Sequence, residues 1–116
     1  MNLQEFKRLK NDKNVLDVVA SKTDEIYEAS LKCCSKETKC MIIMEELAEL
    51  QQVVSKFARG ELLDIDMLLE EVADVYTCLG MISMLTGTSG DEVMASIAAK
   101  LYREGVRRGV IEEDKL

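Results

Sequence analysis

Apolar residues recur every three or four positions along most of the chain, the spacing that places side chains on one face of an α-helix. In residues 2–10 this spacing predicts a short helix, which ends in a polar stretch at 11–14. The spacing continues from Val15 to about Lys32, where polar residues at 21–24 weaken its middle. The second segment is therefore one long helix or two shorter ones.

Three longer helices are expected in the rest of the chain. The first runs to about Arg59 and ends at Gly60, because glycine is common just after a helix; the second runs to about Leu85. The third is followed by residues 111–116, a tail that is frayed or forms one short turn. Before each helix stands a side chain that can accept a hydrogen bond from its first turn. These capping candidates are Ser35 or Thr38, Asp64 or Asp66, and Ser89 or Asp91.

Four helices, or five with the short one at residues 2–10, are joined by short loops and predict an all-α helical bundle. The absence of proline and the presence of only six glycines favour the same class. We expect one domain over residues 1–116, a length that supports a single hydrophobic core. The helices between 41 and 85 are apolar around most of their circumference, so we also expect a homo-oligomer that covers them.

Composition limits the classes of partner. Apolar residues make up 47% and charged residues 32%, as in soluble globular proteins. The formal net charge of −7 argues against duplex nucleic acid, whose binders are usually basic. No apolar run is long enough to span a bilayer, and the N-terminus lacks the apolar core of a signal peptide. We therefore expect a cytoplasmic protein without a membrane partner.

The cysteines do not indicate a metal or redox site. None of them forms a Cys-x-x-Cys pair, and the chain has no histidine to complete a mixed zinc site. Reduced thiols that pack in a cytosolic protein are the expected state. These cysteines are Cys33, Cys34, Cys40 and Cys78.

Two acidic segments, 45–49 and 70–74, stand out against this background. The three glutamates of the first are the only charged residues between Lys39 and Lys56. From residue 72 to 90 the only charge is Asp74. Carboxylates in otherwise apolar helices are costly unless a cation satisfies them.

The two acidic segments lie at matched distances from a turn. Glu49 and Glu71 are each eleven residues from Gly60, and Glu46 and Asp74 are each fourteen from it. An antiparallel hairpin that turns near Gly60 would place Glu49 level with Glu71 and Glu46 level with Asp74. Within each helix the two carboxylates, three residues apart, share one face, and so does the first glutamate of each segment, four residues before the last carboxylate. The sequence thus predicts four or five converging carboxylates.

Converging carboxylates repel each other and need a counter-charge. Mg²⁺ is the natural choice because it prefers oxygen ligands, and Mn²⁺ is an alternative. Di-iron sites in four-helix bundles use histidine, which this chain lacks. The other explanation is that the glutamates are exposed helix positions paired with lysines. The doubled segments, their matched spacing and the lack of nearby basic residues favour the metal site.

Glu-Glu-x-x-Glu on one helix, followed about twenty residues later by Glu-x-x-Asp, resembles the MazG-like superfamily of all-α nucleoside triphosphate pyrophosphatases. The superfamily includes dimeric dUTPases, dCTP pyrophosphatases and phosphoribosyl-ATP pyrophosphohydrolases. The likeness covers roughly Met41 to Arg108, with Leu50 and Val75 as flanking apolar positions. The matching acidic residues are Glu45, Glu46, Glu49, Glu71 and Asp74.

The resemblance implies Mg²⁺-dependent hydrolysis of a nucleoside triphosphate between the α and β phosphates, which yields the monophosphate and pyrophosphate. It implies a homodimer or homotetramer and a role in removing unwanted triphosphates from the nucleotide pool. Glu45, or a carboxylate beside it such as Glu46, would orient or deprotonate the attacking water. The implied metal ligands are Glu46, Glu49, Glu71 and Asp74.

A basic group on the last helix adds a candidate for substrate binding. Lys100, Arg103 and Arg107 follow the spacing i, i+3 and i+7, which places them on one helix face. They could clamp the triphosphate, or they could form a solvated patch with Glu104 as an ion-pair partner. Many members of the superfamily carry asparagine where this chain has Glu104.

The sequence leaves open two other functions besides that of a triphosphate pyrophosphatase. One is a non-catalytic helical oligomerisation module with an acidic stripe. The other is an enzyme of the phosphoribosyl-ATP pyrophosphohydrolase kind. The sequence assigns no nucleobase.

Overall fold

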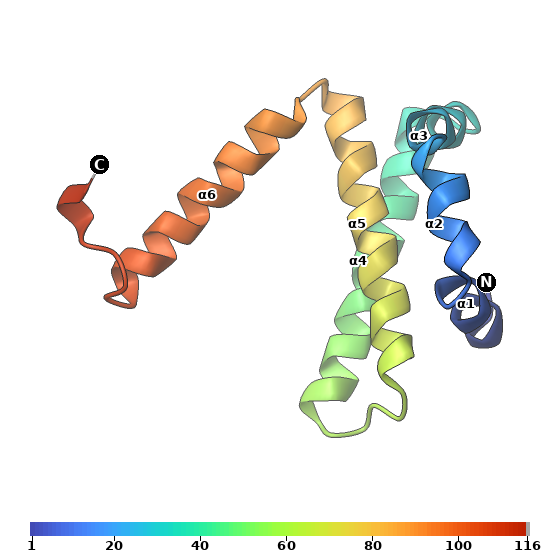
Figure 1. Cartoon of the computed structure of the whole chain (residues 1–116), viewed down its shortest axis with the longest axis horizontal. Coiled ribbons are helices and arrows are strands. Elements are labelled where there is room, and N and C mark those ends of the chain that lie inside the picture. Colours follow the sequence, from blue (N-terminus) through green and yellow to red (C-terminus); the bar gives the residue numbers. More distant parts are fainter. Residues whose placement is uncertain (116) are drawn as a thin grey trace. The chain divides into compact units, whose positions relative to one another are not determined.

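The protein is all-α, as its sequence predicts. A computed structural model describes residues 1–115, which form six α-helices and one 3-10 turn and contain no strand (Figure 1). The chain forms two compact units, Met1–Met81 and a second that begins at Ile82. The single domain over residues 1–116 stays a prediction. The helices are α1 (Leu3–Lys10), α2 (Lys13–Ala20), α3 (Thr23–Lys32), α4 (Lys36–Ala58), α5 (Ile65–Thr86) and α6 (Gly90–Arg107).

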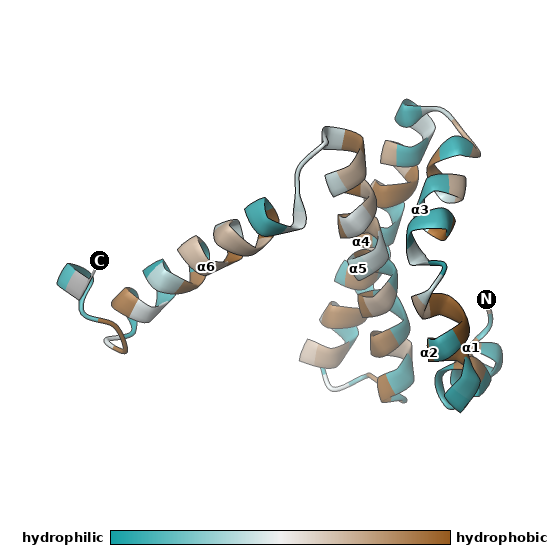
Figure 2. Ribbon diagram, turned by 45° about the horizontal axis from the view of Figure 1, so that its top comes forward, coloured by the Kyte–Doolittle hydropathy of each residue, from teal (hydrophilic) through white to brown (hydrophobic). Residues whose placement is uncertain are grey.

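The N-terminal half of the first unit consists of three short helices. The apolar segment that begins near Val15 forms two helices, α2 and α3, because the polar residues around Ser21 interrupt it. Asp12 caps α2 by accepting a hydrogen bond from the backbone N–H of Asn14 at 2.9 Å. Hydrophilic residues dominate α1, whereas hydrophobic residues are prominent in α5 (Figure 2).

Helices α4 and α5 run side by side as the predicted antiparallel hairpin (Figures 1 and 2). Ser35 caps α4, since its hydroxyl accepts a hydrogen bond from the N–H of Thr38 at 3.1 Å. The helix ends at Ala58, and Gly60 follows its C-cap Arg59 with a φ of +71°, in the left-handed region that favours glycine. The N–H of Gly60 donates to Phe57 O at 3.1 Å, and the next N–H, of Glu61, donates to Lys56 O at 2.9 Å. These two hydrogen bonds form a Schellman motif, which terminates α4 and fixes the position of the turn towards α5.

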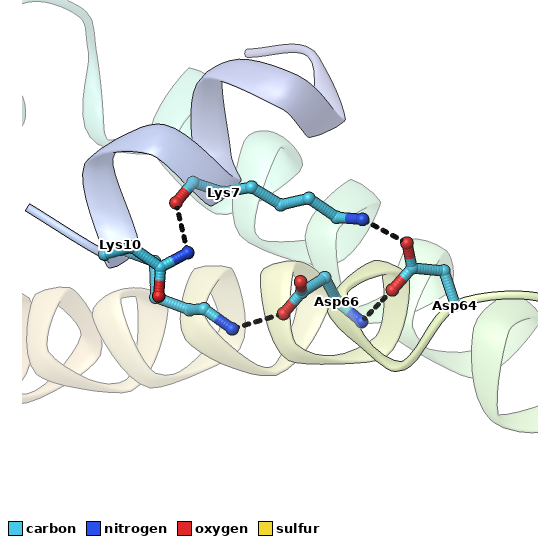
Figure 3. A network of polar contacts seen from close by, with 5 residues as sticks. Lys7, Lys10, Asp64 and Asp66 are labelled. Carbon is cyan, nitrogen blue, oxygen red and sulfur yellow. Dashed lines mark hydrogen bonds and ion pairs between the residues drawn. The ribbon is translucent and has the colours of Figure 1, made fainter.

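Helix α1 is attached to the start of α5 by two ion pairs. Lys7 binds Asp64 and Lys10 binds Asp66 through their ammonium groups (Figure 3). Asp64 also caps α5, because its Oδ1 accepts a hydrogen bond from the N–H of Asp66 at 2.9 Å. Asp64 is thus the capping residue of the two that the sequence offered.

The second unit contains α6 and the segment that follows it. Ser89 caps α6 by accepting a hydrogen bond from the N–H of Glu92 at 3.1 Å. After the helix, the chain turns back so that the hydroxyl of Tyr102 donates to Glu113 O at 2.7 Å. Within the predicted tail, Glu113–Lys115 forms a 3-10 turn, and Leu116 lies outside the described residues.

Few side chains are fully buried. Among the described residues only Ile43, Cys78 and Lys39 are about 4–5% exposed, and all three come from α4 or α5. Large apolar side chains on the same helices remain exposed, including Met44 at 66% and Tyr76 at 72%. No helix in the described part of the chain is long and apolar enough to cross a membrane.

Candidate metal centre

Four carboxylates meet between α4 and α5. Glu46 and Glu49 come from α4, and Glu71 and Asp74 come from α5. One oxygen from each side chain can be chosen so that all four atoms lie within 4.8 Å of one another. The convergence that the distances from Gly60 predicted is therefore confirmed.

The pairing across the hairpin follows the predicted register. Partial burial, and after it the negative charge of Asp74, raises the pKa of Glu46 to about 7. Partial burial, and after it the charge of Glu49, raises the pKa of Glu71. Each glutamate thus has as its strongest charged neighbour the carboxylate that the eleven- and fourteen-residue spacings placed level with it.

The carboxylates of this cluster have no cationic partner among the described residues. The atoms Glu46 Oε2 and Glu71 Oε2 are buried and accept no hydrogen bond. None of the ion pairs between described residues involves any of the four side chains. A buried oxygen without a donor costs about 1–3 kcal/mol, and more when it carries charge. The explanation by lysine-paired surface glutamates therefore does not describe this site.

The donor set fits a metal ion. It consists of carboxylate oxygens only, which are the ligands that hard divalent cations prefer. A cation between the helices would give the two buried oxygens a partner and offset the repulsion that raises the pKa of Glu46. The cluster could thus bind a metal ion.

Glu45 is not one of the four clustered carboxylates. It lies next to Glu46 in sequence but on another face of α4, where it lines a shallow apolar groove with Met41, Met44 and Ala48. Its predicted action on the attacking water stays a prediction. A one-residue step along a helix rotates the side chain by about 100°, which accounts for the separation.

The predicted clamp residues Lys100, Arg103 and Arg107 all belong to α6, in the second unit. There Arg103 pairs with Glu113 at 3.1 Å, and Arg107 pairs with Glu104 at 3.0 Å. Both arginines are exposed, so these pairs contribute little stability. Binding of a triphosphate by this group stays a prediction.

Lys39 also lies close to the carboxylates, a position that we did not expect from the sequence. A pocket of about 190 Å³ adjoins the cluster, and Lys39 lines it together with Glu46 and Asp74. A signal was available, because Lys39 precedes Glu46 by seven residues, or two helical turns, and so shares its face. The remaining lining residues are Ser30, Ile42, Ile43, Thr77, Cys78 and Met81.

No protein-family model, curated protein or solved structure matches the chain. The carboxylate cluster itself is therefore the basis for assigning a function.

Proposed function

We propose that the protein is a Mg²⁺-dependent nucleoside triphosphate pyrophosphohydrolase with a MazG-like fold, for which Mn²⁺ can replace Mg²⁺. One observation carries the proposal: the four carboxylates of two facing helices converge within 4.8 Å, and two of their oxygens are buried without a partner. Magnesium sites that use carboxylates and keep open positions typically bind substrate phosphates. The products would be a nucleoside monophosphate and pyrophosphate.

In this proposal the four carboxylates hold Mg²⁺ and thereby position the triphosphate. When bound, Mg²⁺ supplies neutralisation of the phosphate oxygens and lowers the pKa of water. Phosphoryl transfer needs little else from a protein than positioning and electrostatic stabilisation. Net hydrolysis breaks the bond between the α-phosphorus and its bridging oxygen, and the water oxygen forms the new bond.

We assign the attacking water to Glu46 ahead of Glu45. Glu46 belongs to the cluster, whereas Glu45 lines the groove on another face of α4. The attacking water would transfer a proton to a Glu46 oxygen, and Glu46 would then release the proton to solvent.

The proposed assembly is a homodimer or homotetramer. The hairpin that carries the cluster exposes apolar side chains such as Met41, Met44 and Tyr76. A second copy of the chain could cover them, which supports an oligomer. Removal of unwanted triphosphates from the nucleotide pool is the proposed role.

The test is pyrophosphate release from a panel of ribo- and deoxyribonucleoside triphosphates, measured with Mg²⁺, with Mn²⁺ and with chelator. The proposal expects metal-dependent release of pyrophosphate and monophosphate in equal amounts. Release of orthophosphate instead would contradict cleavage between the α and β phosphates. If no triphosphate is cleaved, phosphoribosyl-ATP is the next substrate to test. Failure with both, together with no metal-dependent change in melting temperature, would favour the oligomerisation module.

A further inference from the structure

The pocket beside the carboxylate cluster contains a buried cation. Lys39 is only 5% exposed, and its Nζ donates a hydrogen bond to Ser30 Oγ at 3.1 Å. None of the ion pairs between described residues includes it. An ammonium group carries three donors, so one hydroxyl leaves most of its capacity unused.

A buried ammonium without an anionic partner is costly, because it has lost its water without gaining an ion pair. A buried lysine is therefore usually paired with an acidic side chain. Lys39 has no such ion pair, although Glu46 and Asp74 line the same pocket. Their oxygens lie beyond the 4 Å of an ion pair, which leaves space between the lysine and the carboxylates.

The order of residues along the two helices places this space next to the proposed metal. On α4, Lys39, Ile43 and Glu46 follow one another at i, i+4 and i+7, and Ile43 is buried. On α5, Asp74 and Cys78 are four residues apart and line the same pocket. The lysine therefore lies at one end of the stripe of side chains whose other end carries the candidate metal ligands.

We propose that Lys39 binds a phosphate oxygen of the substrate while Ser30 positions its ammonium group. The inference rests on the proposed function and adds a residue to it, since it names a cation in the same unit as the carboxylates. The chemistry it recognises is an anionic phosphate ester or anhydride. In the pocket the phosphate would lie between Lys39 and a metal held by Glu46 and Asp74, with positive charge on both sides.

The test uses inorganic pyrophosphate as the probe and isothermal titration calorimetry on the full chain with saturating Mn²⁺. Lys39→Met keeps the length of the side chain and removes its charge. We expect it to raise the dissociation constant of pyrophosphate by about 10- to 100-fold, the usual effect of losing a charge-assisted hydrogen bond. Lys36→Met is the matched control because Lys36 is exposed at the start of the same helix, and it should leave the dissociation constant within about twofold.

Binding of Mn²⁺ alone, followed by electron paramagnetic resonance, separates this inference from the proposed function. Lys39→Met should bind Mn²⁺ at least as tightly as the wild type, because it removes a positive charge near the cluster. If the wild type fails to bind Mn²⁺, the proposed metal centre is wrong. If Mn²⁺ binds but pyrophosphate binds the wild type and Lys39→Met equally, the role of Lys39 is wrong while the metal centre stands.

Folding of the variants provides the remaining control. The melting temperature of ligand-free Lys39→Met shows whether the variant folds, because the desolvation cost of the ammonium group and its attraction to the nearby carboxylates are lost together and act in opposite directions. Lys39→Gln serves as a second neutral variant if Lys39→Met does not fold. A lower melting temperature in both variants, with unchanged pyrophosphate binding, would make Lys39 a structural residue and overturn the inference.

Discussion

Glu46 on α4 and Asp74 on α5 face each other across the hairpin, and the charge of Asp74 is the strongest charged contribution to the raised pKa of Glu46. Fourteen residues separate each of them from Gly60, one on either side. Both also line the pocket that contains Lys39. The pair therefore joins the candidate metal centre to the proposed phosphate site.

The pH dependence of stability should report this pair. The pKa of Glu46 rises from 4.5 to about 7 on folding, so the folded state holds a proton more tightly than the unfolded state. Between about pH 4.5 and pH 7 the free energy of unfolding of the metal-free protein should therefore fall as the pH rises. Thermal denaturation in chelator at half-unit intervals measures this slope. Glu46→Gln should flatten it, and an equal slope in that variant would contradict the assignment.

Neutral replacements of the other ligands should separate stability from metal binding. Glu49→Gln or Asp74→Asn removes one charge from the repelling cluster, so the metal-free melting temperature should rise. Removing a residue that hydrogen-bonds to a metal ligand typically lowers metal affinity by about 10- to 100-fold. Loss of a ligand itself should therefore lower metal affinity by at least about 100-fold. Hydrolysis should be abolished. Glu37→Gln, at the exposed start of α4, is the control and should change neither property.

Added metal should stabilise the wild-type protein. A metal ion that binds only the folded state adds about 2.7 kcal/mol at a free concentration 100 times its dissociation constant. We expect the melting temperature to rise when Mg²⁺ or Mn²⁺ is added and to fall back to its metal-free value when chelator is added. The rise should shrink well below pH 7, because carboxylates must be deprotonated to bind metal. A rise of the same size with Na⁺ at equal ionic strength would indicate screening of charge rather than a bound ion.

Asp64 both caps α5 and forms an ion pair with Lys7 of α1, and two variants can separate the contributions of the cap and the ion pair to stability. Asp64→Ala removes both the cap of α5 and the pair with Lys7, whereas Asp64→Asn keeps a capping side chain and removes only the charge. The melting temperature should therefore fall more in Asp64→Ala than in Asp64→Asn. The hydrogen bond from Lys7 lowers the pKa of Asp64, so the stability from the pair should be lost as the pH falls below the ordinary value of 3.8. Equal melting temperatures for the two variants would show that the cap contributes nothing.

The turn between α4 and α5 should not tolerate a side chain at Gly60. Its φ of +71° is unfavourable for any residue with a Cβ, so Gly60→Ala should lower the free energy of unfolding by about 1–2 kcal/mol. Gly90→Ala is a matched control, because Gly90 has no positive φ and a Cβ added there, as at Gly60, would meet no atom within 4 Å. It should be neutral or slightly stabilising. Urea denaturation of both variants measures the difference.

The sequence predicted the hairpin and the four carboxylates because both depend on local rules. Capping residues and a glycine fixed the ends of α4, and the spacing from Gly60 then determined which carboxylates face each other. It did not predict that Lys39 is buried, since this depends on α3, which supplies Ser30 from nine residues earlier in the chain. The four-residue spacing between Glu45 and Glu49 also predicted a shared face for Glu45, but from α4 only Glu46 and Glu49 belong to the cluster.

The Gly60 turn has a consequence for how this chain can vary in length. One residue inserted into α5 between the turn and Glu71 would rotate Glu71 and Asp74 by about 100° and remove both from the face that meets α4. One residue inserted into the loop at 61–64 would leave the faces of both helices intact. In related chains that keep the site, insertions and deletions should therefore occur in this loop rather than in the helical segments between the turn and the carboxylates.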